Sequence, residues 1–182
     1  MEASIKYTCH RCGDSIDHYG LCQSCSEWLA EYHNESSNLD PICEFKDQEE
    51  LDVCLEWWKQ KLFLMDWVIS ASIIPMKDFE MEDSVGENLM VFDNKEAVIH
   101  IVPKDDFPND AVTKFCQEKV LVHELLHCLY NFMQPPANSY EGKYLDTMEH
   151  QRLDMMAKSL IMVKYGLDFS WFKNDKTKTD AS

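Results

Sequence analysis

The sequence predicts an α+β fold in which one helix is followed by a small three-stranded sheet and two further helices. Apolar residues recur at helical spacing between positions 47 and 65. β-branched and apolar residues then dominate several short runs between positions 67 and 102. Residues 113–132 contain neither glycine nor proline, and a second helical run ends near Tyr165. With 45% hydrophobic and 12% aromatic residues, the chain of 182 residues has the composition of a globular protein.

The sheet is expected to consist of one strand followed by a hairpin. Residues 67–75 form a β-branched run that ends at Pro75, and residues 88–92 and 97–102 flank the turn residues Asp93 and Asn94. Within the last run, valine and histidine alternate with isoleucine, which is typical of a strand whose two faces differ. His100 is therefore expected to be a solvent-facing strand residue and not a metal ligand.

The motif His123-Glu124-Leu125-Leu126-His127 lies inside the run without glycine or proline. Residues four apart on an α-helix lie one above the other, so both imidazoles point the same way. Such a pair can bind one Zn²⁺, and Glu124 can reach the remaining coordination space as a general base. The motif therefore predicts a catalytic zinc site.

A catalytic zinc site needs a third protein ligand and leaves one position for water. In one known arrangement, a glycine and a third histidine follow the second histidine within a few positions, and that third histidine is the ligand. The positions after His127 contain neither residue. Glu149 is the predicted ligand, because it begins an apolar stripe on the second helical run. His150 and Asp146 are competing ligands, and Asp154 is a candidate for orienting an imidazole.

An HELLH motif followed by a helix-borne glutamate resembles the gluzincin branch of the zincin metallopeptidases. The chain is most similar to the minimal zincins of the SprT-like and ImmA/IrrE-like kind, several of which occur in bacteria and phages. The resemblance covers roughly residues 48–167 and implies that His123, His127 and Glu149 bind zinc while Glu124 activates water. It also implies that the strand at 96–102 borders the cleft and pairs with an extended substrate peptide.

The chain departs from the thermolysin-like pattern around the third ligand. Those proteins usually carry an Asn-Glu pair there, followed by an aspartate four residues later. Here Met148 precedes Glu149, and the acidic residue is Asp154, one position further on. The departure concerns the residues that support the ligands more than the ligands themselves.

The N-terminal segment carries a second metal motif. Two CxxC pairs stand close together and predict a structural Zn²⁺ held in a closed site by Cys9, Cys12, Cys22 and Cys25. So short a segment cannot bury a useful core, so the metal must supply the folding free energy. This zinc ribbon is expected to be structural or to bind a protein partner. The remaining cysteines are expected to be reduced and buried: Cys43, Cys54, Cys116 and Cys128.

These patterns divide the chain into a zinc ribbon at 1–33, a linker at 34–46, a zincin-like domain at 47–172 and a disordered tail at 173–182. The formal net charge of −16 argues against nonspecific nucleic-acid binding, which requires a basic surface. No apolar run approaches the length of a membrane span, and no signal peptide is recognisable. The expected location is the cytoplasm.

The sequence thus predicts a small zinc metallopeptidase that cleaves protein or peptide substrates. Two Zn²⁺ are expected, one catalytic and one structural. Tyr140, Tyr144 and His150 are the candidates for stabilising the oxyanion. One alternative is a zincin-like regulator or adaptor that acts by protein binding with little or no cleavage. A second alternative is a hydrolase of a non-peptide amide.

Overall fold

The computed structural model describes the backbone of residues 7–8, 15–16 and 140–146, and all atoms of residues 40–80, 84–108, 113–130 and 147–173. The chain divides into two compact units, Met1–Asp40 and Pro41–Ser182. In the first unit, strand β1 (Tyr7–Thr8) pairs antiparallel with β2 (Ser15–Ile16). The predicted ligands Cys9, Cys12, Cys22 and Cys25 lie outside the described residues, as do positions 174–182 of the predicted tail.

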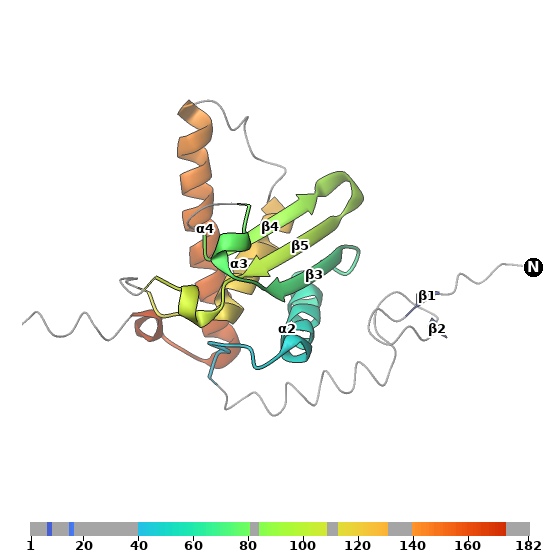
Figure 1. Ribbon diagram of the computed structural model, residues 1–182, viewed down its shortest axis with the longest axis horizontal. Helices are drawn as coiled ribbons and strands as arrows, with labels where there is room; N and C mark the ends of the chain where they lie inside the picture. Colours follow the sequence, from blue (N-terminus) through green and yellow to red (C-terminus); the bar gives the residue numbers. More distant parts are fainter. Residues whose placement is uncertain are drawn as a thin grey trace, which may run out of the picture. The chain divides into compact units, whose positions relative to one another are not determined.

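The second unit has the α+β architecture expected from the sequence, with its elements in the expected order (Figure 1). These elements are α2 (Gln48–Lys61), β3 (Val68–Ile73), β4 (Gly86–Val91), β5 (Glu96–Ile101), α3 (Gln117–Tyr130) and α4 (Tyr140–Tyr165). Helix α2 begins where the side chain of Asp47 accepts a hydrogen bond from the amide of Glu50, a standard N-cap. None of the helices in the described part of the chain is long and apolar enough to cross a membrane.

The three strands form one sheet in the order β3-β5-β4. Strands β4 and β5 form the predicted antiparallel hairpin, whose turn closes at Lys95 in the left-handed region (φ 54°). Strand β5 pairs parallel with β3 on its other side. The expectation that residues 96–102 form a free edge for a peptide is therefore wrong. The chain passes from edge strand β3 to edge strand β4 before β5 fills the gap between them.

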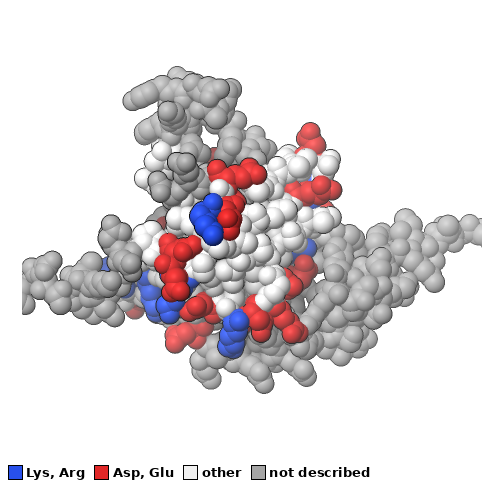
Figure 2. Space-filling view, viewed as in Figure 1, with Lys and Arg blue, Asp and Glu red and all other residues white. Residues whose placement is uncertain are grey.

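One face of the sheet is buried against the helices, and the other is exposed over part of its area. Five inward side chains of β3 and β5 are buried, and Ile73 at the end of β3 is partly buried: the five are Ile69, Ala71, Ala97, Ile99 and Ile101. They join a core that includes Leu51 and Trp58 of α2 and Leu121 and Leu125 of α3. On the other face, Val68 is 72% exposed. Figure 2 shows mainly uncharged side chains across the middle of the described surface, with acidic side chains around them.

The segment before α2 belongs to the folded unit. The carbonyls of Ile42 and Cys43 accept hydrogen bonds from the amides of Glu118 (3.1 Å) and Gln117 (3.0 Å), the first residues of α3. Phe45 is buried in the core, and its amide donates to the side chain of Gln117. Residues 41–46, predicted as part of the linker, thus provide hydrogen-bond acceptors for the start of α3.

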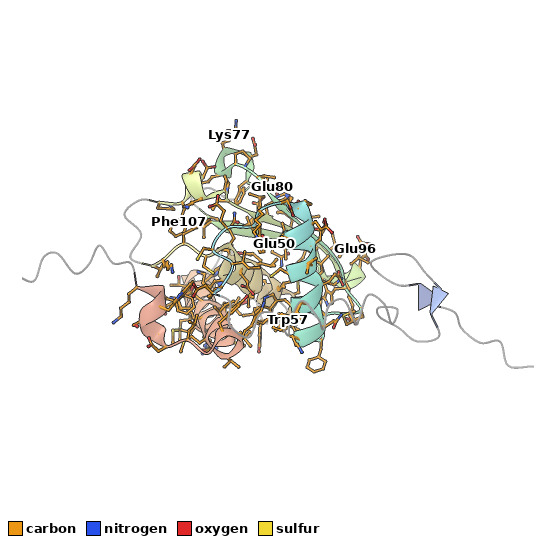
Figure 3. All side chains as sticks on the ribbon, turned by 90° about the horizontal axis from the view of Figure 1, so that it is seen from below. Glu50, Trp57, Lys77, Glu80, Glu96 and Phe107 are labelled. Atoms are coloured by element: carbon orange, nitrogen blue, oxygen red, sulfur yellow. The ribbon has the colours of Figure 1, made fainter. Side chains whose placement is uncertain are left out.

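A single buried carboxylate links this segment to all three helices. Glu118 is fully buried, and Ile42 donates its amide to it at 3.1 Å. The indole of Trp58 on α2 donates at 2.9 Å, and Lys164 and Tyr165 on α4 donate at 2.6 and 2.7 Å. Figure 3 shows the side of α2 that carries Trp57, the neighbour of Trp58. Because a buried carboxylate is costly without partners, these donors fix how the helices pack.

Replacing Glu118 with glutamine should lower the free energy of unfolding by about 3 kcal/mol or more, because Lys164 would remain as a buried charge without its counterion. Urea denaturation of the purified chain measures the change. The matched control is Glu44→Gln, because Glu44 pairs with Lys104 at the surface at 3.3 Å with both side chains more than half exposed. That control should change the free energy by less than about 1 kcal/mol. Equal effects in the two variants would contradict the structural role of Glu118.

Candidate metal centre

Three histidines meet where helices α3 and α4 pack together. His123 and His127 lie one turn apart on α3, with their ring centroids 5.1 Å apart. His150 on α4 completes the group, with its ring centroid 5.8 Å from that of His123 and 4.9 Å from that of His127. One nitrogen from each ring lies within 4.8 Å of the others. Among the described residues, these histidines form the group of three or more side chains whose ligand atoms are close enough together to hold a metal ion.

The chemistry of this group suits a transition metal. Zn²⁺ binds neutral imidazole nitrogens at about 2.0–2.1 Å, so nitrogens this close can converge on one ion with small side-chain adjustments. His123 is in the required state, because burial lowers its pKa to about 3, helped by the neighbouring His127, Lys119 and His150. At neutral pH its ring is therefore uncharged and has a lone pair to donate.

The structure brings His150, and not the predicted Glu149, into the group with the two HELLH histidines. Glu149, the residue before it, is half-buried like His150, and one oxygen of its carboxylate is enclosed, but it does not belong to the histidine group. His150 is one of the two competing ligands that the sequence offers. The other competitor, Asp146, has a side chain outside the described atoms.

The difference arises from the rotation of α4 about its own axis. The predicted inward stripe contained Glu149, Leu153, Met156, Leu160 and Val163, but Val163 is 83% exposed. Among the described side chains of this helix, the fully buried apolar ones are Leu153, Ala157 and Ile161, and His150 lies on the same side one turn toward the N-terminus. In addition, α4 begins at Tyr140, so Glu149 lies well inside the helix instead of near its start.

Glu124, the residue after His123, lies in an enclosed position. Its side chain is buried, and burial raises its pKa to about 8, with Lys119 opposing the shift and Glu87 adding to it. Gly86 of β4 faces it so closely that a Cβ built there would lie 2.6 Å from Oε1 of Glu124 and 2.5 Å from Cγ1 of Val120. Glu124 is therefore held between α3 and the beginning of strand β4.

Asn88 attaches strand β4 to the helix that carries the histidines. Its side-chain amide donates to the backbone carbonyl of Glu124 at 2.7 Å and to the thiol of Cys128 at 3.3 Å. Neither Asn88 nor Gly86 was predicted from the sequence. A glycine in a strand is a signal of close backbone approach, so Gly86 could have been flagged. Nothing in the sequence distinguishes Asn88 from an ordinary strand residue.

Asp154 holds α4 against α3 through lysines. Its two oxygens accept from Lys119 at 2.9 Å and Lys158 at 2.6 Å, instead of orienting an imidazole, the role for which the sequence made it a candidate. Burial acts to raise the pKa of Asp154, but the two ammonium groups outweigh it and the pKa is lowered. Asp154 is therefore a carboxylate at neutral pH, and its charge balances the lysine beside His123.

His100 lies on β5 outside the histidine group. Its Nδ1 lies 2.7 Å from the buried carboxylate of Glu87 on β4, and its side chain is 19% exposed. The expected solvent-facing histidine is thus partly buried in a cross-strand pair. The side chains of the proposed oxyanion residues Tyr140 and Tyr144 lie outside the described atoms.

Comparison with known proteins gives no relative from which to assign a function: no family model, no curated protein and no solved structure matches the chain. The fold and the site define an α+β unit in which three imidazoles converge between α3 and α4, and a buried carboxyl group follows the first of them on α3. The three imidazoles can hold a divalent transition metal, and the carboxyl group is a candidate proton acceptor.

Replacing Gly86 with alanine should disturb both stability and the histidine group, because the new methyl group would collide with Val120 and Glu124. Such overpacking typically costs about 1–3 kcal/mol. Urea denaturation and titration with Co²⁺, followed by its visible absorption, measure the two effects. Gly166→Ala is the matched control, because Gly166 has φ +64° and a Cβ added to it would meet nothing within 4 Å. This control should lose stability through backbone strain and bind Co²⁺ like the wild type.

Proposed function

We propose that the unit Pro41–Ser182 is a zinc-dependent peptidase of the zincin class, with His123, His127 and His150 as the metal ligands. One observation carries the proposal: a histidine from a separate helix meets the HELLH pair, with all three ligand nitrogens within 4.8 Å. Three protein ligands and one open position are the hallmark of catalytic zinc, whereas structural zinc sites are closed by four.

The ligand set refines the family assignment. A gluzincin uses a glutamate as its third ligand, and the resemblance pointed to Glu149 for that role. The geometry supports His150 instead, so the proposed site is a three-histidine variant on the minimal zincin arrangement of helix, sheet and two site helices. The HELLH helix and the order of the helices and strands are the other features that this chain shares with the minimal zincins.

Zn²⁺ bound here would lower the pKa of a water molecule and polarise a substrate carbonyl. Glu124 is the proposed general base, because it follows His123 directly in the HELLH motif and its side chain is buried. In the proposed reaction, its carboxylate accepts the proton of the attacking water and later delivers it to the leaving amine.

The edge of the sheet supports a peptide substrate. Strand β4 pairs with β5 on one side, and no described strand pairs with its other side. Gly86, at the start of β4, lies directly against Glu124. A peptide that added to this edge by backbone hydrogen bonding would pass close to the proposed base. The substrate strand therefore belongs beside β4 and not beside β5.

The N-terminal unit is proposed to be a zinc ribbon whose Cys9, Cys12, Cys22 and Cys25 hold a structural Zn²⁺. The spacing of the two CxxC pairs supports this proposal, and the antiparallel pair β1–β2 is the kind of short hairpin on which such ribbons are built. We propose that the ribbon binds a protein partner, since residues 1–33 contain few basic residues for nucleic acid.

The third ligand can be identified by the zinc content of two neighbouring variants. Wild-type protein should contain about two zinc ions per chain, one in each unit. His150→Ala should lose the ion of the second unit and retain about one, whereas Glu149→Ala should retain about two. Elemental analysis of protein purified without added metal measures the content. The opposite result, loss in Glu149→Ala and retention in His150→Ala, would restore Glu149 as the ligand.

Catalysis can be tested with Glu124→Gln, which keeps the size of the side chain but removes the proton acceptor. This variant should retain its zinc and lose about 10²–10⁴-fold in the rate of peptide hydrolysis, measured on a mixed peptide library by mass spectrometry. Glu96→Gln, at an exposed position of β5, is the matched control and should hydrolyse peptides like the wild type. Unchanged function in a zinc-loaded Glu124→Gln protein would favour the adaptor, which acts by binding alone.

A further inference from the structure

Two cysteines that are far apart in the sequence meet at the start of helix α3. Cys116 immediately precedes α3, and its thiol donates to the carbonyl of Ile42 at 3.6 Å. The carbonyl of the next residue, Cys43, accepts from the amide of Gln117 at 3.0 Å. The Cys43 side chain is also close enough to the Cys116 thiol to raise its pKa. The backbone contacts therefore bring the two cysteines side by side.

The backbone is close enough for a covalent link. The Cα atom of Cys43 lies about 2.4 Å from its own carbonyl oxygen. The Cα atom of Cys116 lies about 2.4 Å from the amide nitrogen of Gln117. With the hydrogen bond of 3.0 Å, the two Cα atoms can be at most about 7.8 Å apart. Disulfides span Cα separations of about 4.4–6.8 Å, so at most a small backbone adjustment is needed.

We propose that Cys43 and Cys116 form a reversible disulfide that locks the segment before α2 onto the first residues of the site helix. The pair constitutes a redox-sensitive modification site. It is independent of the proposed metal centre, because neither cysteine belongs to the histidine group.

The reaction is a thiol–disulfide exchange with an oxidised small-molecule disulfide such as glutathione disulfide. Cys43 is the attacking residue because it is partly exposed, whereas Cys116 is buried. The hydrogen bond with Cys43, together with burial, raises the pKa of Cys116 well above its usual range. The Cys43 thiolate forms a mixed disulfide and releases one thiol. The Cys116 sulfur then displaces the second thiol, which leaves with the proton of Cys116, so two electrons pass to the oxidant.

The other described cysteines lack such a neighbour. The thiol of Cys54 lies near Glu118, whose charge contributes to the raised pKa of Cys54, and the thiol of Cys128 accepts from Asn88. Both are buried. Among the described cysteines, the contact between two thiols is thus specific to Cys43 and Cys116.

The disulfide would reinforce contacts that already hold α3 in place. Ile42, next to Cys43, exchanges hydrogen bonds with Glu118 in both directions: its amide donates to the side chain and its carbonyl accepts from the backbone. A covalent bond beside these contacts would keep residues 41–43 on α3 when the unit begins to open. Oxidation should therefore stabilise the second unit, and reduction should release it.

The experiment uses the full chain, reduced and then incubated with glutathione disulfide without denaturant. Remaining thiols are alkylated, and the protein is digested after lysine, arginine and glutamate. Cys43 then lies in the peptide 36–44 and Cys116 in 115–118, apart from the four N-terminal cysteines. The expected product is the cross-linked pair of these peptides, detected by mass spectrometry and lost after treatment with dithiothreitol. The oxidised protein should also melt about 5 °C or more above the reduced protein.

Cys43→Ser removes the partly exposed partner and should abolish both the cross-linked peptide and the redox-dependent rise in melting temperature. Cys54→Ala is the control and should retain both. The proposal is overturned if the two peptides remain separate after complete reaction of Cys43 with the oxidant. It is equally overturned if Cys43 is found linked to another cysteine, or if the cross-link forms only in urea.

Discussion

The position of helix α3 depends on the burial of one charged side chain, Glu118. A carboxylate with no exposed surface is tolerated only if charge and hydrogen-bond partners replace its water. Lys164 supplies the charge, and its ammonium group also lies 4.1 Å from the ring centroid of Trp57 and 5.3 Å from that of Trp58. These contacts bring α2, α3 and α4 together at one point. Because α3 carries the HELLH motif, the ion pair also fixes where the histidines lie.

A second set of charges determines which residue of α4 faces the histidines of α3. Asp154 accepts from Lys119 on α3 and from Lys158 on its own helix, which ties the two helices together near His123. Together with the buried line of Leu153, Ala157 and Ile161, this contact sets the rotation of α4. His150 is on the same side of the helix as that line. The third histidine of the site thus follows from helix packing at some distance from it.

Much of the fold could be predicted from local patterns. Helix α2, the hairpin of β4 and β5, and the helical HELLH motif each follow from the spacing of apolar residues or from turn residues. The order of strands in the sheet could not be predicted, because pairing between β3 and β5 depends on contacts across the whole unit. A local pattern also could not show that residues 41–46 dock on α3, since they contain no regular element.

The sequence could locate the part of the candidate site that lies on α3. His123, Glu124 and His127 need only a helix, and the helix is present. To identify the third ligand, one must know which side of α4 faces α3. Several overlapping apolar stripes on α4 fit the sequence almost equally well. The stripe that led to Glu149 also includes Val163, which is exposed, so the stripe is not buried along its whole length. The contacts of Asn88 and Gly86 with α3 could be predicted only by knowing which strand lies against α3, and this depends on the order of strands in the sheet.

Helix α3 carries two buried glutamates, and the difference between them supports the functional assignment. Glu118 receives hydrogen bonds from four donors and is matched by a buried lysine, so its charge is fully accommodated by structure. Glu124 is as enclosed, but burial dominates its environment and raises its pKa to about 8. A structural carboxylate would be expected to gain partners as Glu118 has. A carboxyl group that is buried without such a cluster of donors among the described residues, on the same helical turn as His123, is a candidate for proton transfer more than for stability.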